Sequence, residues 1–167
     1  MRHLLKICGG LTFIVYLTST GCVSVDVLPP APKKATDVKI KVPTKDFKEI
    51  INSSVDRAWQ NDKNGNTIAY LSECNSKSDP TLKAIETENL TALTNVEVIE
   101  SKSDNFNDRE ALFSSVKGQV DGVPVKMRLI IFKKNGCNYT LSYVGRSKFF
   151  DHDVDTFKTF TEGFSTP

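Results

Sequence analysis

The chain has 167 residues, of which 39% are hydrophobic, and it carries 22 Lys and Arg against 20 Asp and Glu. This size fits one globular domain with tails and argues against a two-domain enzyme. The net charge of +2 comes from Arg2 and Lys6, so the rest of the chain is neutral and lacks the basic excess of a nucleic-acid-binding surface.

Residues 1–21 have the pattern of a secretory signal peptide. Arg2 and Lys6 precede an apolar run at residues 7–17, and small residues follow it. A membrane-spanning helix needs roughly 20 apolar residues, whereas this run is shorter and contains two glycines. The sequence therefore predicts export and removal of residues 1–21.

The next residues suggest a membrane anchor. The tetrapeptide Ser19-Thr20-Gly21-Cys22 resembles the lipobox of bacterial lipoproteins, although Ser19 stands where Leu is usual. In that family the signal is cut before the Cys, which is then acylated on its thiol and its new amine. The resemblance implies that Cys22 is lipidated and that the protein is bound to a membrane without spanning it. The alternative is a free Cys22 thiol behind an ordinary secretory cleavage site.

Residues 22–46 differ in composition from the rest of the chain. They contain four of the seven prolines and five lysines. Proline extends such a segment and lysine keeps it solvated, so we expect a spacer between the membrane and a domain at residues 47–167. Contact of these lysines with anionic lipid headgroups is a second interpretation.

From residue 47 onward, short alternating segments separated by turn residues indicate an antiparallel sheet. Strands are predicted at residues 55–61, 67–74, 96–103, 110–121, 123–131 and 137–144. Asn-Gly or Asp-Gly pairs at Gly65, Gly122 and Gly136 favour hairpin turns, because these residues accept a positive φ. Ile130 and Phe132 are apolar between apolar neighbours, which suggests that both faces of this strand are partly covered.

Two helices are predicted beside these strands. The first begins at Asp79-Pro80 and runs to about Thr94, with a capping carboxylate and a first-turn proline. The second covers residues 151–164, where apolar residues recur at roughly helical spacing. Both helices need a sheet to lie on, so the fold class is α+β, with helices packed on an antiparallel sheet.

Four segments resemble the PsbP-like and DcrB-like family of small bacterial envelope proteins. They are AWQNDKNGNTIAYLSEC, FNDREALFSSVKGQVDGVPVKM, CNYTLSYVG and FKTFTEGF. The resemblance implies an α/β/α sandwich and an extrinsic or lipid-anchored protein that acts by binding partners. These motifs are structural, and they carry over no catalytic residue.

Cys74 and Cys137 are predicted to form a disulfide. Once Cys22 is lipidated, these are the two cysteines left after residue 21, and an oxidising compartment favours their pairing. One ends a predicted strand and the other begins one, so an antiparallel pair can bring them together. A bridge over so long a loop stabilises by about 4 kcal/mol in the chain-entropy model. A zinc site is the alternative, but two isolated cysteines and one remaining histidine are a poor ligand set.

The sequence contains no recognisable catalytic set. His152 is the one histidine after residue 21, and we interpret the neighbouring acids Asp151, Asp153 and Asp155 as groups that cap the last helix. The nucleophile elbow, the HExxH motif, the P-loop and the GxGxxG fingerprint are absent. Trp59, Tyr70, Tyr139 and Tyr143 are assigned to the core rather than to a ligand groove.

Two segments match the spacing of calcium-binding loops in part. They are Asp62, Asn64, Asn66 and Glu73, and then Asp151, Asp153, Asp155 and Glu162. Both lack the glycine required at position six, where Thr67 and Thr156 stand. We therefore expect no metal and no cofactor.

The sequence thus predicts a non-catalytic, lipid-anchored protein of the bacterial cell envelope that faces the periplasm and binds an envelope protein partner at the membrane. Val23 follows the lipidated cysteine, and under the sorting rule of enterobacterial lipoproteins the absence of Asp there favours the outer membrane. The alternatives are a periplasmic small-ligand-binding protein, which needs an apolar cavity, and an enzyme with an unrecognised carboxylate site, which needs an acidic cleft.

Overall fold

The computed structural model describes residues 32–43, 46–52, 54–75 and 78–166. They belong to one compact unit that spans Ala31–Pro167. The predicted signal peptide and the predicted lipidation site Cys22 lie outside the described residues. No helix within the described ranges is both long enough and apolar enough to cross a membrane.

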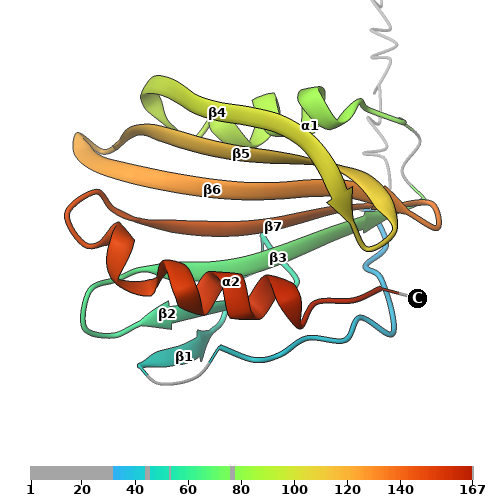
Figure 1. Cartoon of the computed structure of the whole chain (residues 1–167), viewed down its shortest axis with the longest axis horizontal. Coiled ribbons are helices and arrows are strands. Elements are labelled where there is room, and N and C mark those ends of the chain that lie inside the picture. Colours follow the sequence, from blue (N-terminus) through green and yellow to red (C-terminus); the bar gives the residue numbers. More distant parts are fainter. Residues whose placement is uncertain (1–31, 44–45, 53, 76–77, 167) are drawn as a thin grey trace, which may run out of the picture. The chain divides into compact units, whose positions relative to one another are not determined.

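Seven antiparallel strands form a single sheet (Figure 1). They are β1 (Phe47–Ile50), β2 (Arg57–Asn61), β3 (Thr67–Cys74), β4 (Thr94–Phe106), β5 (Arg109–Val120), β6 (Val123–Lys134) and β7 (Cys137–Arg146). The order across the sheet is β1-β2-β3-β7-β6-β5-β4. Strands β1–β3 and strands β4–β7 are therefore two meanders that meet at the β3–β7 pair.

The hairpin turns form where the sequence predicted them. Asp121 and Gly122 have φ values of 49° and 77°, and Asn135 and Gly136 have φ values of 52° and 73°. Two successive positive φ values define the tight turns that match the twist of the flanking strands. Gly65, with φ of 79°, lies in the longer β2–β3 turn.

Cys74 and Cys137 form a disulfide, which confirms the predicted pairing. The two residues lie directly opposite each other on β3 and β7, with Cα atoms 4.0 Å apart. The bridge therefore joins the two meanders at one end of their shared seam.

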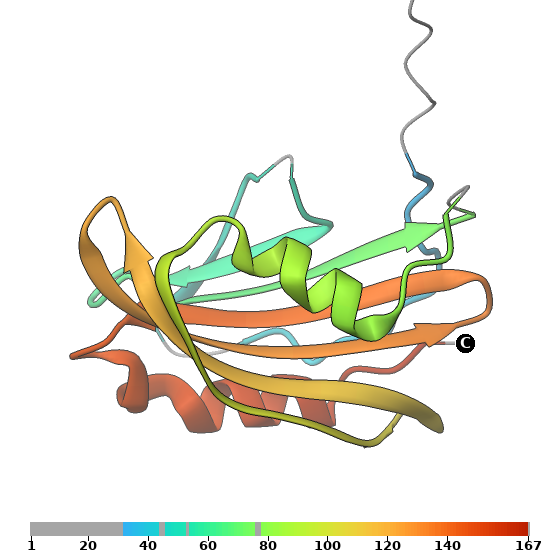
Figure 2. The ribbon, with the colours of Figure 1, turned by 90° about the horizontal axis from the view of Figure 1, so that it is seen from above.

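One helix lies on each face of the sheet (Figures 1 and 2). Helix α1 (Leu82–Leu90) packs on β5 and β6, on the surface called here the α1 face. A short 3-10 turn, η1 (Phe150–Asp153), leads into α2 (Val154–Glu162), which lies over β2, β3 and β7 on the opposite α2 face. The helices thus cover opposite faces of opposite halves of the sheet.

Aromatic side chains hold α2 and the chain that follows it to the sheet. The phenylalanine rings lie 5.4–5.7 Å from their partners in the pairs Phe157–Tyr143, Phe160–Trp59 and Phe164–Tyr70. Trp59, Tyr70, Tyr139 and Tyr143 are all buried, which confirms their assignment to the core. Burial raises the pKa of Tyr143, whose hydroxyl donates to the carbonyl oxygen of Phe150.

Helix α1 differs from the prediction at both ends. Its N-cap is Thr81, whose hydroxyl accepts a hydrogen bond from the Ala84 N–H at 3.1 Å. Asp79, the predicted cap, forms an ion pair with Lys133 instead. The helix ends at Leu90, and β4 already begins at Thr94, the predicted helix end.

Residues 33–40, called the strap below, contradict the prediction of a solvated spacer. Lys33 pairs with Cys74, and Lys39 pairs with Ser165, through backbone hydrogen bonds. Apolar side chains of the strap pack against the aromatic core; they are Ala35, Val38 and Ile40. The compact unit therefore begins well before residue 47. The alternation at residues 38–42 (VKIKV) contained this signal, which the proline and lysine content of the segment obscured.

Candidate functional site

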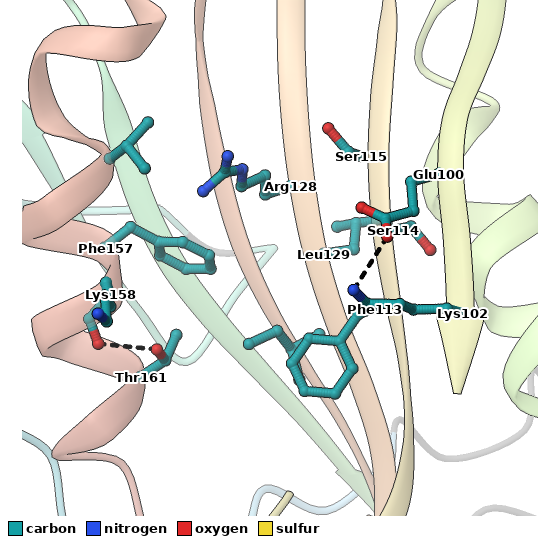
Figure 3. A pocket seen from close by; sticks show the side chains of 12 residues that line it. Glu100, Lys102, Phe113, Ser114, Ser115, Arg128, Leu129, Phe157, Lys158 and Thr161 are labelled. Atoms are coloured by element: carbon teal, nitrogen blue, oxygen red, sulfur yellow. Dashed lines mark hydrogen bonds and ion pairs between the residues drawn. The ribbon is translucent and has the colours of Figure 1, made fainter. Parts of the chain in front are cut away.

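A groove of about 360 Å³ lies on the α2 face, between α2 and strands β4, β5 and β6 (Figure 3). Side chains of β5 and β6 form its floor, while α2 and β4 form its two walls. The apolar lining includes Phe113, Ile130, Val154 and Phe157, and the polar lining includes Glu100, Lys102, Ser115, Arg128, Lys158 and Thr161.

The groove exists because one helix is too narrow for this sheet. Strands lie about 4.8 Å apart, and a helix with its side chains is about 10 Å wide, so one helix covers two or three strands. The aromatic contacts place α2 over β2, β3 and β7. Among the described residues, consequently, no helix lies above strands β4, β5 and β6 on the α2 face.

The strand register brings the groove residues together. Phe113 on β5 lies opposite Ile130 on β6, and Ser115 lies opposite Arg128. On the other side, Lys102 of β4 is the partner of Phe113. Directly opposed residues project on the same side of an antiparallel sheet, so these side chains share the α2 face.

Positive charge predominates along the groove, with three cations against one carboxylate in its lining. Lys102 is 2.9 Å from Glu100, and the hydrogen bond between them raises the pKa of Lys102. Lys158 lies 3.9 Å from Glu162. Arg128 forms no ion pair with any carboxylate in the described part of the chain, and its guanidinium lies 6.0 Å from the centre of the Phe150 ring. The groove therefore has an apolar floor and one cation, Arg128, without an acidic partner among the described residues.

Glu86 is the most deeply buried acidic residue, and it lies on the opposite α1 face. Its carboxylate accepts hydrogen bonds from Ser101 of β4, at 2.9 Å, and from Ser114 of β5, and it forms an ion pair with Lys83. Burial alone would raise the pKa of Glu86, but the bonds from Lys83, Ser114 and Ser101 outweigh burial, so the pKa lies below its ordinary value. This carboxylate connects α1 to β4 and β5, two of the strands that line the groove.

Asp56 holds the strap in place. Its carboxylate accepts hydrogen bonds from the hydroxyl and the backbone N–H of Ser72, and it lies 3.4 Å from the Lys34 ammonium group. The Ser72 hydroxyl also accepts a hydrogen bond from the Ala35 N–H at 2.7 Å. The role of Asp56 is thus to connect the strap to β3.

Asp153 joins η1 to the β2–β3 turn. Its carboxylate accepts hydrogen bonds of 2.7–3.2 Å from the side-chain amides of Asn61, Asn64 and Asn66. It makes no side-chain cap bond to α2, so the predicted capping role is wrong for this residue. A Cβ at Gly145 would lie 2.0 Å from the Asn66 Oδ1 atom, which explains the glycine at that position.

The two segments that resembled calcium loops meet at this same point. The amides of Asn64 and Asn66 act there as hydrogen-bond donors to Asp153, in an orientation opposite to that of a metal ligand. The described residues include no group of three or more His, Cys, Asp or Glu that could hold a metal ion. His152 is exposed, and its ring lies 5.8 Å from the ring of Phe149.

Sequence reasoning missed the groove and the buried Glu86. Glu86 lies four residues after Leu82 and one after Ile85, on the apolar side of α1, and this position was a usable signal. The groove had a weaker signal, because a sheet of many strands with one helix per face leaves strands uncovered. Which strands stay uncovered depends on contacts between residues far apart in the chain.

No family model matches the sequence, and no curated protein matches it. The solved structures that resemble the chain include two of known context. LpqN of Mycobacterium tuberculosis, involved in cell envelope biogenesis, is 14% identical, with a TM-score of 0.57 over 78% of this chain and 83% of its own. Cyanobacterial PsbP (CyanoP) from Synechocystis sp. PCC 6803 is 11% identical, with a TM-score of 0.55 over 85% of this chain and 96% of its own. At such identities the likeness concerns the fold alone: the chain has a PsbP-like α+β fold.

Proposed function

We propose that this protein is a non-catalytic, lipid-anchored component of the bacterial cell envelope that binds a membrane-associated partner through its groove. The observation that carries the binding role is the groove itself, a concave surface with a largely apolar lining beside a well-packed core. Ligands bind in concave, mostly apolar sites that also hold a few polar groups. The role as a binding module therefore follows from the part of the sheet that α2 leaves open.

The proposed location derives from the sequence at the N-terminus. A signal-like segment and the lipobox-like Cys22 support export and lipidation, and Val23 supports the outer membrane. The Cys74–Cys137 disulfide is typical of an oxidising compartment such as the periplasm. LpqN, which shares the fold, is a protein of cell envelope biogenesis, and this agrees with the proposal.

The position of the strap limits how far the domain can move from its anchor. The strap begins at Lys33, eleven residues after Cys22, and fully extended chain of that length spans at most about 40 Å. The groove would thus remain within reach of components at the same membrane surface.

The groove offers little for catalysis. Its lining includes one carboxylate, Glu100, which is paired with Lys102. Chemistry that relies on a pair of carboxylates, such as glycoside hydrolysis, needs a second such group, and neither Glu86 nor Asp56 lies in the groove. These observations favour binding over the alternative of an enzyme with a carboxylate site.

In vivo photo-crosslinking tests the proposal. Ser115 and Ser142 form a matched pair, because both are half-buried serines on strands, and Ser115 lines the groove whereas Ser142 lies on the α1 face. A photoreactive amino acid at residue 115 should capture a membrane-associated component, and the same residue at 142 should capture none. Replacement of Cys22 by Ala should abolish both the lipid modification, measured by mass spectrometry, and the capture. Equal capture from both positions would contradict the proposal.

A further inference from the structure

We propose that the group bound in the groove is the alkyl chain of an anionic amphiphile, whose headgroup pairs with Arg128. This inference rests on the proposed binding role of the groove and specifies the chemistry of its ligand. It follows from three properties of the groove: a floor without free backbone groups, a cation without an acidic partner, and a suitable volume.

The floor favours an alkyl chain over a peptide. Strands β5 and β6 lie inside the sheet, and each is paired along its length with a neighbour on both sides. Their backbone N–H and C=O groups are therefore already occupied. A peptide against Phe113, Ile130 and Phe157 would leave its own backbone groups without partners, at a cost of about 1–3 kcal/mol each. An alkyl chain has no such groups and loses nothing there.

The charges favour an anionic headgroup at one place. Lys102 and Lys158 each have a carboxylate nearby, whereas Arg128 has no carboxylate partner among the described residues. Its side chain extends into the space between β6 and α2 (Figure 3). A guanidinium binds phosphate or carboxylate through two parallel hydrogen bonds, so Arg128 fits an anionic headgroup better than a cationic or neutral one.

The size of the groove agrees with this ligand. Its volume of about 360 Å³ is at the lower end of the range found for small-molecule sites, about 300–1,000 Å³. Helix α2 limits the groove through Val154 and Phe157, and β4 limits it through Lys102. We therefore expect one alkyl chain rather than two.

The test compares three amphiphiles with the same tail, each below its micelle concentration: dodecyl phosphate, dodecyl maltoside and dodecyltrimethylammonium. Binding is measured by calorimetry on the full chain carrying Cys22→Ala, which removes the lipid acceptor. Dodecyl phosphate should bind at least about 10-fold more tightly than dodecyltrimethylammonium, as expected for a charge-assisted hydrogen bond. Equal affinities for the three probes would overturn the assignment of the headgroup.

Three variants locate the site. Arg128→Gln should weaken binding of dodecyl phosphate about 10-fold and leave dodecyl maltoside unchanged. Lys148→Gln, which alters an exposed cation next to Phe149 and outside the groove, is the matched control and should change neither. Ser115→Trp should block all three probes, and Ser142→Trp on the α1 face should block none. Thermal midpoints report whether either Trp variant fails to fold, and binding that survives in a folded Ser115→Trp protein would overturn the site.

The ligand could come from the bilayer or from solution, and vesicles distinguish these sources. After incubation with phosphatidylglycerol or phosphatidylcholine vesicles, the re-isolated protein is extracted and its lipid quantified. Phosphatidylglycerol in the extract supports a bilayer source, while binding of dodecyl phosphate with no extracted lipid supports a soluble one. If no amphiphile binds but crosslinking from residue 115 still captures a protein, the ligand assignment is wrong and the proposed function stands. If amphiphiles bind but crosslinking captures nothing, the assignment stands and the proposed function is wrong.

Discussion

The two halves of the sheet are stabilised in different ways. On the α2 face, strands β2, β3 and β7 are covered by aromatic rings that belong to α2 and the residues flanking it. Strands β4 and β5 are held instead from the α1 face, where the buried carboxylate of Glu86 joins α1 to both of them. One half depends on aromatic packing, and the other depends in part on a buried charge.

This difference explains how the molecule can keep an open groove. The edge strand β4 and its neighbour β5 do not need a helix on the α2 face, because α1 already fixes them from the other side. Part of the α2 face, at Phe113 and Ser115 of β5, thus remains accessible to another molecule. The same arrangement predicts that buried residues of the covered half matter for stability and that the exposed groove residue Arg128 does not.

The largest effect is expected in the covered half. Phe160 is buried against Trp59, and Phe160→Ala removes a ring that the neighbouring side chains cannot replace. We expect a loss of about 4 kcal/mol in the free energy of unfolding, measured by urea denaturation. Thr159→Ala, on the exposed side of the same helix, should change it by less than about 0.5 kcal/mol. A small effect of Phe160→Ala would show that aromatic packing does not dominate this half.

The β3–β7 pair, within the covered half, gives the next effect. The double variant Cys74→Ala and Cys137→Ala removes the bridge that joins the two meanders. We expect it to lose about 3 kcal/mol in the free energy of unfolding, because the unfolded chain is no longer constrained. This is less than the chain-entropy model gives, since measured effects of disulfides often fall below that model. The same loss should appear when the wild-type protein is unfolded under reducing conditions, and a stability unchanged by reduction would contradict the prediction.

In the other half, Glu86 provides the test. Glu86→Ala leaves the buried hydroxyl of Ser114 and the hydroxyl of Ser101 without their acceptor, and we expect a loss of about 3 kcal/mol. Glu86→Gln keeps an acceptor without the charge and should lose about 1 kcal/mol. Exposed Glu88→Gln on the same helix is the control and should be neutral.

The pH dependence of this half has a defined sign. The pKa of Glu86 is lowered in the folded protein, so its stabilising effect is fully present above the ordinary pKa of 4.5 and is lost as the pH falls through the folded value. The stability difference between the wild type and Glu86→Gln should therefore shrink below about pH 4.5. A difference that stays constant down to pH 3 would show that charge is not what holds α1.

Local patterns were sufficient to predict most strands, the turns and the disulfide. The β3 strand and the Asn-Gly and Asp-Gly turns are determined by residues close in sequence. The Cys74–Cys137 pair follows from the antiparallel direction of two strands. The strap was missed because Val38 and Ile40 alternate within a segment whose proline and lysine content indicated a spacer. Burial there depends on packing against an aromatic core and on the backbone pairing of Lys39 with Ser165, far along the chain, which composition does not report.

The groove could not be predicted from local pattern for a related reason. Phe113 and Ile130 alternate as core residues do, and nothing in their own strands separates a buried face from a face that lines a groove. That distinction depends on where α2 settles across the sheet, and contacts with Trp59 and Tyr70 decide it. The sequence therefore identifies the strands of the candidate site but not the site.

The smallest effect on stability is expected in the groove, where Arg128→Gln removes an exposed cation that has no carboxylate partner in the described chain. We expect a change of less than about 0.5 kcal/mol in the free energy of unfolding, since loss of a distant cation–ring contact is all that the folded state gives up. Urea denaturation of both variants, Arg128→Gln and Phe160→Ala, gives the change in the free energy of unfolding for each half of the sheet under the same conditions. A loss of 2 kcal/mol or more in Arg128→Gln would assign the groove to the structure of the domain rather than to binding. An unchanged stability, together with weaker binding of dodecyl phosphate, would show that Arg128 contributes to ligand binding and not to the stability of the fold, in contrast to Phe160.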